Sequence, residues 1–364
     1  MSENSINYKQ KIMRAHANEE RNRWRIIHMR NFDVEKYMKE SEAAYAKRTD
    51  IEALADKLTE RGYDNIVVIG IGGTWAEWSP VVHVMRHYTD MPIYLENAAE
   101  LCVRTDKNFL NKRSLVVTSS ESGNTKEVVE AVKMCKDMGI ETSVLTKNAD
   151  SELGKLCDNV VDGCTGDCEH FYIMCYLFGL RLLYNRGEFP SYEKFADQMA
   201  NLGKDLVAVR EKFEERAAQI ARDYHKEPYN IFVSSGTLWG ETYLFSMCIL
   251  EEMQWVRTKS VTSADFFHGT LELIEKDVPV FLFKGEDEYR PLDERVERFC
   301  EKLTDKLVVI DTKEYELPGI DDEFRVICSP MILTSLVTDR LAAHYELNTG
   351  HSLEFRRYYR QFDY

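Results

Sequence analysis

Short apolar runs alternate with amphipathic stretches over most of the 364-residue chain. In the first half, the runs that predict buried strands lie at 66–69, 92–95, 115–118, 141–146 and 160–161. Helical spacing, with apolar residues three and four positions apart, precedes them over 33–62 and recurs between them, first over 76–88. Strands that alternate with helices predict an α/β fold with a mostly parallel sheet and helices on both of its faces.

The same alternation returns in the second half of the chain. Its predicted strands and extended stretches lie at 231–233, 259–265, 278–283, 307–310 and 326–327. Its predicted helices lie at 238–254, 292–302 and 330–346. A long helical region over 168–224, broken near Pro190, separates the two halves. The pattern therefore predicts two α/β units in tandem, joined by a helical connector.

These changes of pattern set the predicted domain boundaries. We expect an N-terminal helical arm over 1–45, a first α/β domain over 46–167, a helical connector over 168–226, a second α/β domain over 227–348 and a C-terminal tail over 349–364. The last part of the tail, 356–364, carries four aromatic residues, which favours a packed segment over a free end.

Composition narrows the class of protein. Apolar residues make up 44% of the chain and its net charge is −15, so sizeable cores are possible and nucleic-acid binding is disfavoured. No apolar run approaches the ~20 residues of a membrane helix, and the first residues lack the apolar core of a signal peptide. The nine cysteines are dispersed, which predicts reduced thiols in a cytoplasmic protein.

A hydroxyl-rich loop follows the predicted strand at 115–118. It contains Ser120, Ser122, Gly123, Asn124 and Thr125, and an amphipathic helix begins directly after it. Strand, small polar loop and helix together present backbone N–H groups and a positive helix end to an anion. The loop has no Walker lysine. An ordinary helix cap would need only one hydroxyl, so the sequence predicts a phosphate site here.

A glycine turn ends the first predicted strand. Gly72, Gly73 and Thr74 follow 66–69, and we expect them to contact the ligand, because ligands of parallel sheets bind beyond the carboxyl ends of the strands. A dinucleotide site is the alternative, but the full glycine spacing is missing. Only Glu96 is a candidate for the acidic residue that would bind a ribose.

A metal site is a second alternative. Cys164, Cys168 and His170 could supply half of one, but no second pair of ligands has matching spacing. We therefore expect no metal and no nucleotide cofactor.

The loop over 120–125 resembles the Ser-x-Ser-Gly-x-Thr loop of sugar isomerase (SIS) domains, which bind the phosphate of a phosphosugar. Two tandem α/β units over roughly 45–350 are similar to enzymes with two SIS domains. The chain looks most like the deglycases of 6-phosphorylated Amadori compounds, relatives of the isomerase half of glutamine–fructose-6-phosphate aminotransferase. The resemblance implies a phosphosugar substrate and a homodimer or larger homo-oligomer.

A second stretch resembles the family's histidine segment. His268 and Gly269 match it, whereas Asp265 stands in place of a glutamate and Thr270 in place of a proline. In the family a catalytic carboxylate lies 16 residues before this histidine, which corresponds to Glu252. The resemblance implies that Glu252 transfers protons and that His268 acts in sugar-ring opening.

Two departures concern the pocket. Trp75 follows Thr74 where the family often has a serine that can donate to the phosphate. The tail over 356–364 has no lysine to match the ring-opening lysine of the aminotransferase relatives.

The expected function is cleavage of a 6-phosphorylated Amadori compound to a hexose phosphate and an amine. An aldose–ketose phosphosugar isomerase, an amino-sugar-phosphate deaminase and a non-catalytic phosphosugar sensor remain alternatives.

Overall fold

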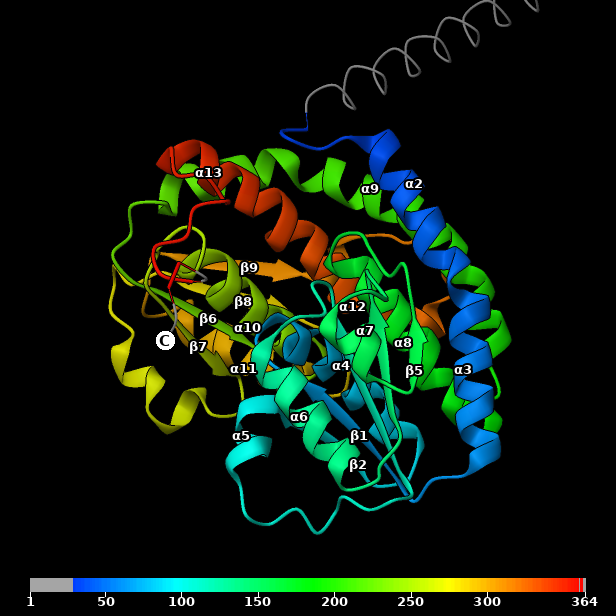
Figure 1. Ribbon diagram of the computed structural model, residues 1–364. Coiled ribbons are helices and arrows are strands. Elements are labelled where there is room, and N and C mark those ends of the chain that lie inside the picture. Colours follow the sequence, from blue (N-terminus) through cyan, green and yellow to red (C-terminus); the bar gives the residue numbers. More distant parts are fainter. Residues whose placement is uncertain (1–28, 360, 363–364) are drawn as a thin grey trace, which may run out of the picture.

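The computed structural model describes residues 29–359 and 361–362 (Figure 1). The predicted arm over 1–45 therefore lies largely outside the described residues. Its last part enters α2 (Val34–Ala46), which packs along the connector helices, and α3 (Arg48–Arg61) follows after a break at Lys47. Gly62, with φ of +76°, ends α3 at the last position of the helical stretch predicted over 33–62.

The first sheet has five parallel strands in the order β2-β1-β3-β4-β5. They are β1 (Asn65–Gly70), β2 (Ile93–Asn97), β3 (Ser114–Ser120), β4 (Thr142–Thr146) and β5 (Asn159–Val161). The connecting helices are α4 (Gly73–Tyr88), α5 (Ala98–Val103), α6 (Lys126–Asp137) and α7 (Glu152–Leu156). All residues of β1, β3 and β4 are buried, because helices cover both faces of the sheet. The predicted strands and their order along the chain are confirmed.

The second sheet has four parallel strands in the order β7-β6-β8-β9. They are β6 (Asn230–Ser234), β7 (Thr258–Thr262), β8 (Val280–Lys284) and β9 (Leu307–Asp311), with α11 (Arg290–Cys300) between the last two. The strand predicted at 326–327 is wrong, because both residues lie in α12 (Arg325–Thr334). A run of two β-branched residues is too short to form a strand here, because the apolar helical pattern that follows it extends the helix over both residues.

Helices α4, α8 (Cys168–Asn185), α10 (Trp239–Tyr243) and α12 lie between the two sheets (Figure 1). Helix α8 is buried on nearly every face, which explains why its sequence is apolar all round. The longest helix, α9 (Tyr192–Tyr224), runs across one side of both halves. At Gly240 a side chain would meet the carbonyl oxygen of Ala76 at 2.2 Å, so a glycine is needed where α10 crosses α4.

Two of the three helices predicted in the second half contain π-helical turns. The first continues from α10 into η2 (Leu244–Glu251), and the second passes from α12 through η7 (Ser335–Leu341) into α13 (Ala342–Thr349). The stretch Asp322–Thr349 is apolar and long enough to cross a membrane by length and composition. However, 83% of its apolar window is buried inside the fold, as in a core helix of a globular protein.

Candidate active site

The glycine turn and the hydroxyl loop leave adjacent strands at the same edge of the first sheet. In the parallel pairing of β1 with β3, Asn65 lies opposite Ser114 and Ile69 opposite Thr118. The chain passes from β1 to β2 on one side and returns to β3 on the other, so the strand order reverses between β1 and β3. Ligands of open α/β sheets bind at such a switch point, beyond the carboxyl ends of the strands.

Two residues of the hydroxyl loop shape it from within. The buried Ser120 hydroxyl accepts a 3.0 Å hydrogen bond from the backbone N–H of Gly123. Gly123 has φ of +64°, and a side chain there would meet Oγ of Ser151 at 2.0 Å. Only glycine fits this position, so Ser120 and Gly123 fix the path of the loop.

The other three residues stand at the start of α6. The Asn124 side chain braces the loop, because its Nδ2 donates to the carbonyl oxygen of Ser122 at 2.9 Å and its Oδ1 accepts from the backbone N–H of Glu152 at 3.0 Å. Thr125 occupies the N-cap position of α6, but its hydroxyl makes no capping bond. The Ser122 Oγ accepts only a longer 3.3 Å bond from the Asn124 N–H. The hydroxyls of Ser122 and Thr125 can therefore donate to an anion at this helix end.

The glycine turn opens the N-terminus of α4 at the same edge. Gly72 is its N-cap residue with φ of +56°, and neither Gly72 nor Gly73 has an atom within 4 Å of where a side chain would begin. The Thr74 hydroxyl closes the turn, because it accepts from the backbone N–H of Ile71 at 3.2 Å and donates to the Ile71 carbonyl at 3.1 Å. The rings of Trp75 and Tyr243 are in edge-to-face contact, with their centres 5.8 Å apart. This contact links the glycine turn to the helix that leads to Glu252.

The corresponding loop of the second sheet is filled by the chain itself. Asp287 accepts hydrogen bonds from the backbone N–H and the hydroxyl of Thr237, at 2.7 and 2.8 Å. Asp293 accepts from the Ser235 hydroxyl at 2.6 Å, and burial raises the pKa of Asp293 to about 6. A side chain at Gly236 would collide with the Asp287 carboxylate. Carboxylates thus take the place that an anion could occupy after β6.

Glu252 lies at the end of the π-helical segment η2. Its backbone N–H donates to the Met247 carbonyl at 3.0 Å, and its carboxylate forms an ion pair with Arg356 of the C-terminal tail, with Oε1 2.7 Å from Nε. The adjacent Glu251 is exposed and accepts a hydrogen bond from the Thr258 hydroxyl instead. The two glutamates therefore have different surroundings.

His268 is exposed at the end of the short helix η3 (Phe266–His268). In the part of the chain that the structure describes, no hydrogen bond or ion pair joins its ring to Glu252 or to any other residue. Asp265, which replaces the family's glutamate, accepts a 3.1 Å bond from the Thr262 hydroxyl. The predicted catalytic pair is thus not connected within a single chain.

Sequence reasoning missed two buried glutamates beside this site. Glu77 lies one turn into α4, is only 8% exposed and has no hydrogen-bond partner among the described residues. Glu241 of α10 is fully buried and accepts from the Tyr172 hydroxyl at 3.0 Å and from the Thr338 hydroxyl. Burial raises the pKa of each carboxyl to about 8, and for Glu77 the charges of Glu241 and Glu121 add to the rise. Nothing in the local sequence marks either residue as buried, because segments distant in sequence pack around them.

Glu77→Gln is expected to make stability less dependent on pH. The pKa of Glu77 is about 8 in the folded protein against an ordinary value of 4.5, so between these values the folded state holds a proton that the unfolded state releases. The free energy of unfolding then falls as pH rises, by about 1.4 kcal/mol per pH unit for this group. Urea unfolding between pH 5 and 8 should give a shallower fall for the variant. Glu130→Gln, on the exposed face of α6, is the control, and parallel curves for Glu77→Gln and wild type would contradict the assignment.

The residues of the alternative sites have other partners. Glu96, the candidate ribose ligand, forms an ion pair with Arg104 at 2.8 Å. His170 contacts the Ser41 hydroxyl at 2.9 Å through Nε2 and accepts from the backbone N–H of Asp167 through Nδ1. The described residues contain no group of three His, Cys, Asp or Glu side chains that could hold a metal ion.

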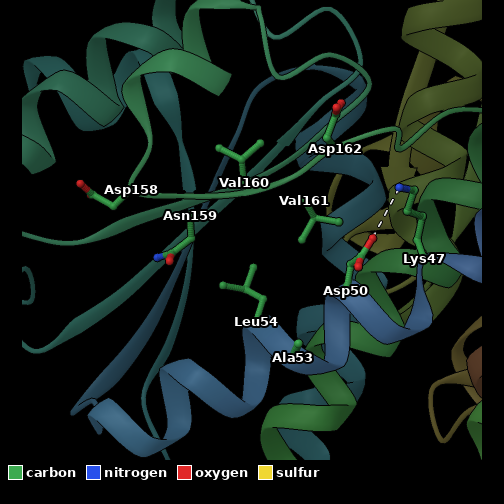
Figure 2. A pocket seen from close by; sticks show the side chains of 9 residues that line it. All are labelled: Lys47, Asp50, Ala53, Leu54, Asp158, Asn159, Val160, Val161 and Asp162. Carbon is green, nitrogen blue, oxygen red and sulfur yellow. Dashed lines mark ion pairs between the residues drawn. The ribbon is translucent and has the colours of Figure 1, made fainter.

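A shallow hollow lies elsewhere, between α3 and β5 (Figure 2). Acidic Asp50, Asp158 and Asp162 stand around it, and Lys47 forms an ion pair with Asp50 at 3.5 Å. None of the predicted site residues lines this hollow, so it is separate from the switch-point site.

Known proteins resemble this chain in sequence. Residues 61–169, which contain the glycine turn and the hydroxyl loop, match the model of the SIS domain. The chain is 30% identical over 339 residues to fructosamine deglycase FrlB of Bacillus subtilis, covering 89% of this chain and 100% of that protein. It is 25% identical over 311 residues to fructoselysine 6-phosphate deglycase of Escherichia coli, covering 85% of this chain and 89% of that protein.

Solved structures share most of the fold. A protein of Bacillus subtilis described as a phosphosugar isomerase superposes with a TM-score of 0.81 at 28% identity, covering 88% of this chain and 99% of the other. A similarly described protein of Salmonella typhimurium also gives a TM-score of 0.81, at 22% identity, covering 87% of this chain and 99% of the other. The tandem arrangement of two parallel sheets is thus common to these proteins.

Proposed function

The chain belongs to the SIS-domain family of phosphosugar enzymes that includes the fructosamine deglycases, and we propose that it cleaves a 6-phosphorylated Amadori compound. It is an SIS-family phosphosugar deglycase or isomerase. The observation that carries the finer proposal is the loop at the start of α6, where the hydroxyls of Ser122 and Thr125 are available beside an open helix end. The products would be a hexose 6-phosphate and a free amine.

In the proposed reaction, Glu252 takes a proton from C1 of the open-chain sugar and returns it to C2. The C1–N bond becomes an imine as the nitrogen gives up its proton and the C2 oxygen gains one, leaving a hydroxyl at C2. Water then adds at C1, the C–N bond breaks to leave an aldehyde at C1, and the amine leaves with the proton that the added water gives up. His268 assists ring opening before this transfer. The phosphate, bound at the loop over 120–125, holds the reacting carbons in place, so that binding energy remote from the reaction supports the proton transfer.

Incubation with fructoselysine 6-phosphate tests the proposal. Release of lysine and a hexose 6-phosphate would support it. Interconversion of hexose 6-phosphates without amine release would instead favour an isomerase, and ammonia release from an amino-sugar phosphate would favour a deaminase. Phosphosugar binding with no turnover of any of these compounds would favour a sensor.

Ser122→Ala combined with Thr125→Val is expected to weaken binding of a 6-phosphosugar. Each lost hydrogen bond to the phosphate should cost about 1.5–3 kcal/mol, which is roughly tenfold or more in Kd. Titration calorimetry should give one site per chain for the wild type, because Asp287 and Asp293 fill the corresponding loop of the second sheet. The control is Thr105→Val, in the exposed loop before β3. Unchanged affinity in the double variant would refute the site.

We also infer a homodimer, in which His268 completes the pocket of the neighbouring copy. The ring is exposed and has no hydrogen-bond partner within the described residues, which supports a role outside its own chain. A monomeric mass in light scattering at micromolar concentration would count against this inference. All nine cysteines are unpaired, which supports our placement of the protein in the cytoplasm.

A further inference from the structure

The C-terminal tail after α13 folds back onto the end of the helix that carries Glu252. Nε2 of Gln254 donates to the His351 carbonyl at 2.6 Å. The rings of Trp255 and His351 are in edge-to-face contact, with their centres 4.2 Å apart. The guanidinium of Arg357 also contacts Trp255 and lies 4.0 Å from the centre of its ring. Trp255 has φ of +57°, an uncommon value for a side-chain-bearing residue, and this turns the chain away from the helix end.

Arg356 is the residue of this tail that reaches Glu252. Its Nε donates to Glu252 Oε1 at 2.7 Å, and its Nη1 donates to the backbone carbonyls of Leu353 at 2.7 Å and Phe355 at 3.0 Å. The guanidinium is thus held by the backbone of the tail itself. The second oxygen of Glu252 has no partner among the described residues, so it is free to meet a substrate carbon.

We propose that Arg356 is a positioning residue for Glu252, which it holds in the orientation needed for proton transfer. The inference rests on the proposed function, in which Glu252 is the base. Glu252 stands at the end of a π-helical segment and its side chain is 28% exposed, so the helix alone leaves the carboxylate several rotamers. A charge-assisted hydrogen bond from an anchored guanidinium selects one of them and leaves the other oxygen available.

Steady-state kinetics of three variants test this role. Arg356→Met is expected to lower kcat by roughly 10- to 100-fold, because small displacements of a reacting group cost rate steeply, while KM changes by less than about threefold. Arg356→Lys should recover part of the loss. The matched control is Arg357→Met, which removes the neighbouring guanidinium from Trp255 and should leave kcat within about threefold of wild type.

The double variant Glu252→Gln plus Arg356→Met separates positioning from a general effect on folding. If Arg356 acts through Glu252, its loss costs nothing more once the carboxylate is gone, whereas independent effects would multiply. Multiplying losses, an equal loss in Arg357→Met, or a change in KM alone would overturn the proposal. A change in KM alone would mean that Arg356 contacts the substrate instead.

The same assays distinguish an error in the proposed function from an error in the role of Arg356. If the wild type releases no amine from phosphorylated Amadori compounds, that function is wrong, and the same variants are compared in hexose 6-phosphate interconversion, which needs the same proton transfer. If the wild type releases amine and Arg356→Met does so equally fast, only the role of Arg356 is wrong. If the protein turns over neither kind of substrate, or Glu252→Gln is fully active, the role of Arg356 falls as well.

Discussion

Glu252→Gln is expected to lower turnover of the phosphorylated Amadori substrate by roughly 10²–10⁴-fold. A general base must be ionised, close to the carbon acid and able to return the same proton. Gln keeps the size of the side chain and can still accept the 2.7 Å hydrogen bond from Arg356, but it cannot take a proton. Substrate affinity should be nearly unchanged, because the phosphate is bound by a different loop. Single-turnover kinetics and calorimetry on the same preparation separate the two quantities.

Glu251→Gln is the internal control for this prediction. Glu251 is adjacent in sequence, but it is exposed and its carboxylate accepts from the Thr258 hydroxyl on β7. Its variant should retain nearly normal turnover. An inactive Glu251→Gln together with an active Glu252→Gln would show that the 16-residue spacing from His268 identifies the wrong glutamate.

Arg210→Met is expected to cost about 3–5 kcal/mol in the free energy of unfolding. Arg210 lies in α9 and is fully buried, and it forms ion pairs with Glu169 of α8 and, at 2.5 Å, with Asp339 of η7. Its guanidinium also lies 4.4 Å from the ring centre of Tyr37 in α2. Removing one partner leaves the buried Glu169 without compensation, so the loss should far exceed that of an exposed pair. Urea unfolding followed by circular dichroism measures it.

Lys276→Met provides the comparison. Lys276 and Asp305 form an ion pair at 3.4 Å with side chains that are 83% and 73% exposed. Solvent weakens such pairs, so this variant should lie within about 1 kcal/mol of wild type. If Arg210→Met cost no more than Lys276→Met, the buried ion pairs of Arg210 would not stabilise the fold.

Much of the architecture could be read from local pattern. The runs at 66–69 and 115–118 are apolar apart from Thr118, because β1 and β3 are buried on both faces. The short loops after these strands place the glycine turn and the hydroxyl loop at one sheet edge. The prediction of a phosphate site at the hydroxyl loop also needed only neighbours in sequence, since strand, loop and helix are consecutive, and it stays a prediction. The roles of Glu252 and His268 came from resemblance, and they stay predictions.

Contacts between distant segments were decided only by the tertiary structure. The strand predicted at 326–327 became part of α12, since helical packing between the sheets outweighs the β preference of two residues. Asp287 fills the loop after β6 from 50 positions away, and Arg356 reaches Glu252 across 104 positions. Glu77 has an ordinary place in the sequence of α4, and only the approach of α8 and α10 removes it from water and raises its pKa. The local sequence pattern shows which face of a helix or strand is apolar. The burial of a side chain and the pairing of its charge depend on which elements pack together, and the packing of the whole chain determines this.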